Sequence, residues 1–204
     1  MSITLPAPQL LILGLGNVLC ADDGLGVEAV LRLHRDYRLP EGVQALDGGT
    51  LGLSLLGYLA EAPRVILVDA VRTGDAPGAA VRLAGEEVAP AVRERLSVHQ
   101  VGVSDLLDGL RLIDAYPQVM VLLGVVPARL DLGLERSPEV TAALPGLVRR
   151  VAAEAAALGF PLPPREEREG RAHDATSQDR PAPCSSEVPT VAWSAERDRL
   201  AERL

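Results

Sequence analysis

Residues 11–26 read LILGLGNVLCADDGLG, and this stretch decides the fold. An apolar run ends at a glycine turn, and two adjacent carboxylates, Asp22 and Asp23, follow before an amphipathic segment begins. This order is typical of the strand, turn and helix of an α/β protein. In an open α/β sheet, ligands bind in the crevice outside the carboxyl ends of the strands. We therefore expect Asp22 and Asp23 to lie where the chemistry takes place.

Short runs rich in Val, Ile and Leu recur along the chain and alternate with longer segments of helical period. This alternation is typical of βαβ units over a largely parallel sheet. A fifth run, at residues 79–83, follows a turn signal at residues 74–78 and is expected to pair antiparallel at an edge. The sequence therefore predicts an α/β fold, with a three-layer, largely parallel twisted sheet of about five strands and helices on both faces. The four main runs are Leu10–Leu15, Val43–Leu46, Val65–Asp69 and Val119–Val126.

Apolar residues between these runs predict the helices. Three helices carry apolar stripes, which we expect to face the sheet. A longer helix is expected from Pro138 to Leu158, ended by Gly159. The stripes consist of Leu25, Val27, Val30, Leu31 and Leu33 in the first helix, Leu51, Leu53, Leu55, Leu56 and Leu59 in the second, and Val103, Leu106, Leu107, Leu110 and Ile113 in the third.

The composition of the chain changes after Gly159. Residues 161–204 contain six of the 16 prolines and several Arg-Glu clusters, so this segment has little apolar surface to offset the entropy cost of ordering. We expect residues 1–160 to form one α/β domain. Residues 161–204 are predicted to be a disordered tail, with a short helix around Trp193 as the alternative.

Net charge and cysteine content narrow the function classes. The net charge of −8 disfavours binding to nucleic acid or to an anionic membrane, because phosphate binding needs a basic surface. No apolar run approaches the roughly 18 residues of a membrane span, and the N-terminus has no positively charged region typical of a signal peptide. Cys20 and Cys184 form neither a CxxC motif nor a disulfide framework. We expect a cytoplasmic protein with reduced thiols.

Two further residues are candidates for the same site. Asp69 ends the third run, so its carboxylate is expected at the same sheet edge as the first pair. His99 is expected in the first turn of a helix capped by Ser97, where the positive helix end keeps the imidazole neutral. Two carboxylates and an imidazole suit a divalent cation such as zinc or nickel, and three ligands leave a position open. Each residue also has a structural explanation: helix capping for the first pair, a turn for Asp69 and a solvated surface position for His99.

A dinucleotide-binding module is one alternative to a metal site. Gly14 and Gly16 match the first two glycines of a GxGxxG motif. Leu19 stands at the third position, where close packing of helix and strand needs a small residue. Two carboxylates also follow where a phosphate would bind, which is electrostatically unfavourable.

A serine hydrolase is the second alternative, with Ser97 or Ser104 acting beside His99. The residues around Ser104 do not form the GxSxG turn of such enzymes. Ser97 stands two positions before His99 in the chain, and side chains at that spacing on one helix do not face each other.

Several motifs follow one another along the chain. They are Gly14 to Gly26, Asp47-Gly48-Gly49-Thr50, Val68-Asp69-Ala70, Val98-His99-Gln100 with Ser104-Asp105-Leu106, and Leu123 to Pro127. Together, in their order and spacing, they resemble the hydrogenase maturation endopeptidases. The resemblance covers roughly residues 10–158 and is far more specific than any one motif. It implies a peptidase with the α/β fold predicted above.

The resemblance implies that this chain removes the C-terminal peptide of the nickel–iron hydrogenase large-subunit precursor once nickel has been inserted. The catalytic, metal-contacting residues of the family fall on Asp23, Asp69 and His99. The first of these is often Glu in the family. Asp47 matches an acidic position near the site, with a supporting role.

The implied cofactor is nickel supplied by the substrate, and the implied partner is the precursor, with neither nucleic acid nor membrane involved. The sequence leaves the oligomeric state open, with a monomer as the expectation. A scaffold that binds the nickel-containing precursor without cutting it is the remaining alternative.

Overall fold

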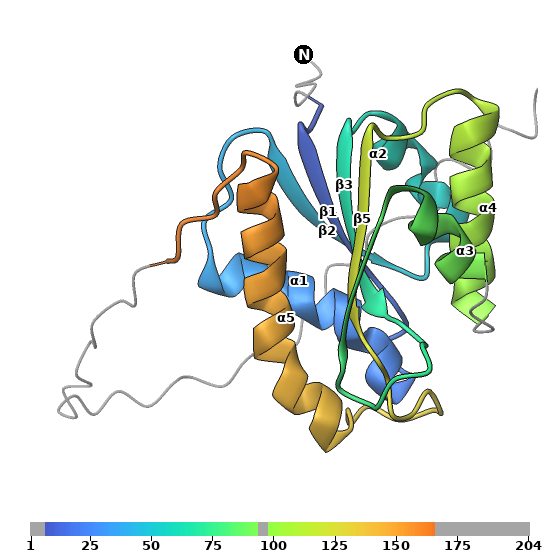
Figure 1. The fold of residues 1–204 in the computed structure, drawn as a ribbon, viewed down its shortest axis with the longest axis vertical. Coiled ribbons are helices and arrows are strands. Elements are labelled where there is room, and N and C mark those ends of the chain that lie inside the picture. Colours follow the sequence, from blue (N-terminus) through green and yellow to red (C-terminus); the bar gives the residue numbers. More distant parts are fainter. Residues whose placement is uncertain (1–6, 94–97, 166–204) are drawn as a thin grey trace, which may run out of the picture. The chain divides into compact units, whose positions relative to one another are not determined.

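Five strands form one sheet in the computed structural model, which describes residues 7–93 and 98–165, with the backbone alone for residues 93 and 98–101. The strand order is β2-β1-β3-β5-β4, and all neighbours are parallel except β4, which runs antiparallel to β5 (Figure 1). The predicted α/β fold is confirmed, and so is the antiparallel edge strand. The strands are β1 (Leu10–Leu15), β2 (Val43–Gly49), β3 (Arg64–Ala70), β4 (Ala80–Ala84) and β5 (Val119–Val125).

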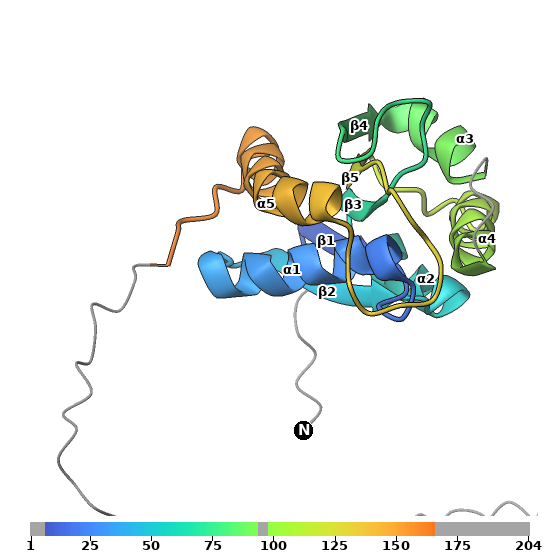
Figure 2. The same ribbon diagram turned by 90° about the horizontal axis from the view of Figure 1, so that it is seen from below.

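Helices cover both faces of this sheet, as predicted. On one face α1 and α5 pack side by side, and α2, α3 and α4 lie on the other (Figures 1 and 2). β1 and the last six residues of β3 and of β5 are buried throughout, which is typical of parallel strands covered on both faces. The helices are α1 (Leu25–Asp36), α2 (Leu56–Ala60), α3 (Val88–Arg93), α4 (Val98–Leu112) and α5 (Pro138–Ala157).

The last helix follows its local sequence signals closely. Ser137 is its N-cap, and the hydroxyl oxygen of Ser137 accepts a hydrogen bond from the backbone N–H of Val140 at 3.3 Å. Pro138 occupies the first helical position, where its missing N–H costs nothing. The helix stops at Ala157, one residue before the predicted end, and Gly159 has a φ of +94° that a helix cannot continue.

The second predicted helix is wrong in length. Gly52 has a φ of +52°, so the chain forms a 3₁₀ helix over Gly52–Leu55 before the short α2 begins. Leu51 and Leu53 are therefore exposed rather than packed on the sheet. Leu31 and Ile113 of the other two stripes are exposed as well. Spacing alone thus extends each stripe beyond the face that the neighbouring elements cover.

The packed chain continues past the expected domain boundary at residue 160. Leu162 is buried, and Pro164 forms a β-bridge with Tyr37. The backbone N–H of Arg165 donates to the carbonyl of Asp36 at 2.8 Å. The first five residues of the expected tail thus pack against the end of α1. The rest of the tail, including Trp193 and Cys184, lies outside the described residues. Within the described parts of the chain, no helix has both the length and the apolar character needed to cross a membrane.

A candidate active site at the carboxyl edge of the sheet

Asp22 is fully buried and is bonded to a loop more than a hundred positions later in the chain. The backbone N–H groups of Ala128 and Arg129 donate to its Oδ2 atom at 2.9 and 3.0 Å, and the N–H of Ser137 donates to Oδ1 at 2.7 Å. Such charge-assisted hydrogen bonds are stronger than neutral ones. Asp22 therefore clamps both ends of the loop that joins β5 to α5. Helix capping is the wrong explanation for this side chain.

Backbone pairing strengthens the same clamp. The N–H of Ala21 donates to the carbonyl of Gly133 at 2.6 Å, and the N–H of Gly133 donates to the carbonyl of Leu19 at 2.9 Å. The loop at residues 126–137 arches over the carboxyl edge of the sheet (Figure 2). It runs side by side with the segment that carries the two adjacent aspartates.

Asp23 is also buried, at 2% exposure, in the 3₁₀ helix Ala21–Gly24. Its Oδ2 atom accepts a hydrogen bond from the backbone N–H of Asn17 at 2.8 Å. Gly16 has a φ of +124°, and a Cβ atom there would lie 1.8 Å from the carbonyl oxygen of Asp23, so this turn requires glycine. The 3₁₀ helix contacts β3. The turn after β1 thus places Asp23 beside the strand that carries Asp69.

Asp69 is the second-last residue of β3 and is 2% exposed. Its Oδ1 atom accepts a hydrogen bond from the backbone N–H of Ala70 at 2.7 Å. Val65 and Leu67 of the same strand pack on the face covered by α4, and side chains along a strand alternate between faces, so Asp69 belongs to the α4 face. The two aspartates come from the ends of neighbouring parallel strands, as predicted.

His99 lies in the described backbone of α4, but its side chain, like Ser97, is outside the described residues. The helix packs on the sheet through the buried Leu106 and Leu110, on the face to which Asp69 belongs. The fold therefore puts the helix that carries the imidazole on the side of the sheet where Asp69 stands. That the imidazole joins the two carboxylates stays a prediction.

Asp47 lies at the same edge but is exposed. It pairs with Gly14 across β2 and β1, and Gly14 pairs with Val68 of β3, one residue before Asp69. Among the side chains that the structure describes, no group of three His, Cys, Asp or Glu is placed to hold a metal ion. The expected set includes His99, so the three-residue metal site also stays a prediction.

Three of the four charged side chains of the β5–α5 loop, Arg129, Asp131 and Arg136, form ion pairs within the chain. Arg129 donates two hydrogen bonds to the carboxylate of Asp131, at 3.0 and 2.9 Å. These bonds and the positive charge of Arg129 lower the pKa of Asp131 below its ordinary value. Arg136 lies 3.8 Å from Glu28 of α1. Glu135, the fourth charged side chain of the loop, is exposed.

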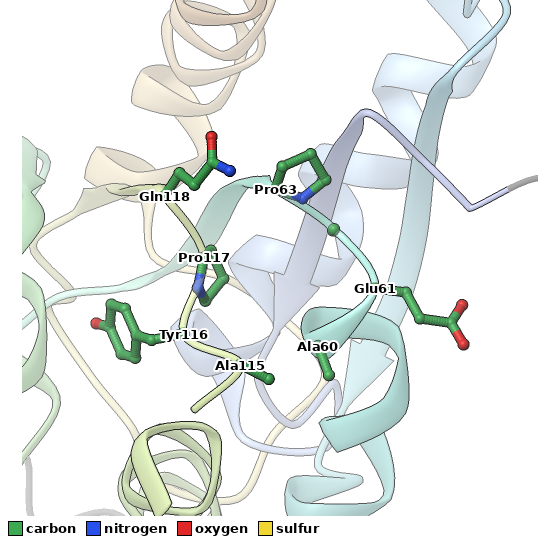
Figure 3. A pocket seen from close by; sticks show the side chains of 8 residues that line it. Ala60, Glu61, Pro63, Ala115, Tyr116, Pro117 and Gln118 are labelled. Atoms are coloured by element: carbon green, nitrogen blue, oxygen red, sulfur yellow. The ribbon is translucent and has the colours of Figure 1, made fainter. Parts of the chain in front are cut away.

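A hollow of about 210 Å³ lies at the opposite, amino edge of the sheet. It is bounded by residues just before β3 and β5, among them Pro63, Tyr116 and Gln118 (Figure 3). Its one carboxylate, Glu61, points away from Tyr116 in this view. This hollow has none of the predicted site residues, and we place the candidate site at the carboxyl edge.

The sequence gives no sign that the β5–α5 loop belongs to the candidate site. The motif from Leu123 to Pro127 contributes to the resemblance, but it assigns no role to the residues after it. The partners of Asp22 are backbone N–H groups, which every residue except proline carries. The only local signal is the pair of adjacent aspartates, and this pair does not show which carboxylate is structural.

Comparisons with known proteins show which family this chain belongs to. The sequence profile of the hydrogenase maturation protease family, HycI, matches residues 27–154, a span that includes Asp69 and His99 and begins after Asp23. The chain is 37% identical over 159 residues to the hydrogenase 2 maturation protease of Escherichia coli (strain K12). That alignment covers 78% of this chain and 97% of the relative.

Solved structures show the same similarity. The hydrogenase maturating endopeptidase HybD from E. coli superposes with a TM-score of 0.74 and 37% identity, over 77% of this chain and 98% of that one. The [NiFe] hydrogenase maturation protease HybD from Thermococcus kodakarensis gives a TM-score of 0.59 and 31% identity, over 72% of this chain and 99% of the other.

Proposed function

This chain belongs to the hydrogenase maturation protease family, and we propose that it removes the C-terminal peptide from the large-subunit precursor of a nickel–iron hydrogenase after nickel insertion. Proteins of this family are named as proteases and endopeptidases, so the chain is a peptide-bond hydrolase. The precursor as substrate and the requirement for nickel are our proposals.

One observation carries the proposal at the level of the site. Asp23 and Asp69 are both buried, and they come from the ends of two neighbouring parallel strands. Each accepts a hydrogen bond from a backbone N–H, and buried carboxylates are as a rule hydrogen-bonded or bound to a cation. Both oxygens of Asp22 bind the β5–α5 loop, whereas Asp23 lies in the turn after β1 and Asp69 near the end of the neighbouring β3. This difference supports Asp23 and Asp69 as the working pair.

We assign Asp23, Asp69 and His99 to contact with the nickel ion of the precursor. Carboxylate oxygens and imidazole nitrogen are suitable donors for such a borderline cation. Nickel is part of the substrate in this proposal, so the chain needs no metal of its own. The two carboxylates and the imidazole orient the nickel-bearing end of the precursor. A divalent ion next to a peptide bond polarises its carbonyl and lowers the pKa of an attacking water.

Cleavage of nickel-loaded and nickel-free precursor tests the proposal directly. The enzyme is first treated with a chelator, the chelator is removed, and the products are weighed by mass spectrometry. We expect loss of the C-terminal peptide from nickel-loaded precursor only. Efficient cutting of nickel-free precursor would overturn the nickel requirement. Binding of the loaded precursor without cutting would favour the scaffold alternative.

Substitutions assign the residues. Asp69→Asn and His99→Ala should each abolish cleavage. The melting temperature should stay near that of the wild type, because Asn keeps the shape and an accepting oxygen of Asp69, and neither change removes an apolar core side chain. Asp23→Glu should retain activity, since Glu is frequent there in the family. Asp75→Asn is the matched control, because Asp75 is an exposed carboxylate in the loop after the same strand as Asp69. Normal cleavage by the Asp69 and His99 variants would rule out this site.

A further inference from the structure

Four large aliphatic side chains stand exposed beside the candidate site. Leu132 and Leu134 of the β5–α5 loop are 81% and 75% exposed, and Val18 and Leu19 of the turn after β1 are each more than half exposed. We call these four residues the apolar ridge. Exposed apolar side chains gathered on neighbouring segments of a folded domain are typical of an interaction site.

The two halves of the ridge are held together by the backbone. Gly133, between the two loop leucines, donates to the carbonyl of Leu19 and forms a β-bridge with Cys20. Asp22 clamps the two ends of the same loop. Because these bonds fix the loop backbone, Leu132 and Leu134 are presented to solvent at a defined place. Preorganisation of this kind lowers the entropy cost of binding.

The chemistry of the ridge suits an apolar partner rather than a charged one. Two of its charged neighbours, Arg129 and Asp131, are bonded to each other, and Glu135, next to Leu134, is exposed. Asp22 and Asp23 are buried directly after the ridge in the chain. The ridge therefore offers aliphatic surface, and its attraction for a partner comes from removing that surface from water.

We propose that the apolar ridge is the docking surface for an apolar segment of the precursor polypeptide whose peptide bond is cut. This inference rests on the proposed function and names the part of the enzyme that recognises the substrate. The occupant follows from continuity with the site. Leu19 is four residues before Asp23, and the loop bonded to Leu19 arches over the edge where Asp23 and Asp69 lie. A polypeptide that reaches these carboxylates lies against the ridge.

The double variant Leu132→Ser/Leu134→Ser tests the ridge. Both side chains are largely exposed, so the melting temperature should not change. We expect KM for nickel-loaded precursor to rise at least about tenfold, the scale expected when two buried contacts of an interface are truncated. We expect kcat to stay within about twofold, because no group at the reacting bond is changed.

The matched control is Leu112→Ser/Ile113→Ser. These residues are 88% and 53% exposed and lie at the end of α4, near the amino edge of the sheet. The control should keep the wild-type KM. Equal KM values for the ridge variant and the wild type would overturn the ridge while leaving the proposed function intact.

Binding and oligomeric state separate the remaining outcomes. If wild-type enzyme fails to cut nickel-loaded precursor, the proposed function fails. In that case the docking role of the ridge is still tested by the Kd of the precursor for the wild type and for the ridge variant. Equal Kd values would overturn that role. A wild-type dimer that becomes monomeric in the ridge variant would show that a second copy of this chain covers the ridge, and it would also overturn the proposal.

Discussion

Replacing Asp22 with alanine should destabilise the domain more than any exposed substitution at the same edge. The fully buried carboxylate accepts three backbone hydrogen bonds at 2.7–3.0 Å. A hydrogen bond to a charged group contributes about 1.5–3 kcal/mol to the free energy of unfolding. The three bonds do not add fully, because the loop N–H groups regain water once the loop detaches. We expect a loss of roughly 3–5 kcal/mol.

Thermal unfolding followed by circular dichroism measures this loss. At about 2–4 °C per kcal/mol for a domain of this size, the melting temperature should fall by roughly 6–20 °C. The melting temperature of Asp22→Asn should lie between those of the wild type and Asp22→Ala. The amide keeps one accepting oxygen, but it turns its NH₂ group toward an N–H donor. Asp131→Ala is the control: it removes a carboxylate from the same loop that pairs only at the surface.

The expected order of melting temperatures is therefore wild type and Asp131→Ala highest, Asp22→Asn next and Asp22→Ala lowest. If Asp22→Ala has the same melting temperature as the wild type, the carboxylate does not hold the loop. If Asp131→Ala instead falls as far as Asp22→Ala, the loop depends on its surface ion pair, and our explanation of the clamp is wrong.

Two further predictions concern the α5 side of the fold. The Arg82 guanidinium is bonded to Glu154 and lowers the pKa of that carboxyl below its ordinary value of 4.5. Because Arg82 is half exposed, Glu154→Gln should lower the free energy of unfolding by at most about 1 kcal/mol at pH values above 4.5. This difference should vanish as pH falls through the lowered pKa, because both proteins then carry a neutral side chain at position 154. Urea titrations from pH 3 to 8 measure the free energy of unfolding of both proteins, and a difference that grows toward low pH would contradict the prediction. A chain ending at Arg165 should melt within about 5 °C of the full chain. A chain ending at Phe160 also loses the buried Leu162, so its free energy of unfolding should be lower by about a further 2 kcal/mol. Calorimetry decides this, and a large drop for the Arg165 chain would show that residues 166–204 stabilise the domain.

Much of the fold follows from local sequence signals. The apolar runs predict all five strands to within three residues at each end, because a strand buried on both faces must be continuously apolar. α5 is predicted to within one residue, because its N-cap serine and first-turn proline fix its start and the glycine after it fixes its end. α2 is not, since the positive φ of Gly52 replaces its first turn by a 3₁₀ helix. α3 shows no apolar stripe long enough to predict.

The candidate site is predictable only in part. Strand-end position predicts that Asp23 and Asp69 share an edge, since parallel strands end together. It cannot separate Asp22 from Asp23, because the partners of Asp22 are N–H groups 106 to 115 positions away in the chain. The ridge has no sequence signal either. Leu132 and Leu134 alternate with Asp131, Gly133 and Glu135 in a loop. Their proposed role follows only from the segment to which the folded loop is bonded.

In the proposed function, the clamp and the ridge connect substrate docking to the position of Asp23, one of the two proposed catalytic carboxylates. The loop that presents Leu132 and Leu134 is bonded to Asp22, and the next residue is Asp23. Loosening the clamp therefore disturbs both ends of one rigid unit. Asp22→Asn, assayed well below its melting temperature, should raise KM and lower kcat together, whereas the ridge variant raises KM alone. An Asp22→Asn enzyme with wild-type kcat would show that the loop and Asp23 move independently, and one with wild-type KM would show that docking does not depend on the clamp.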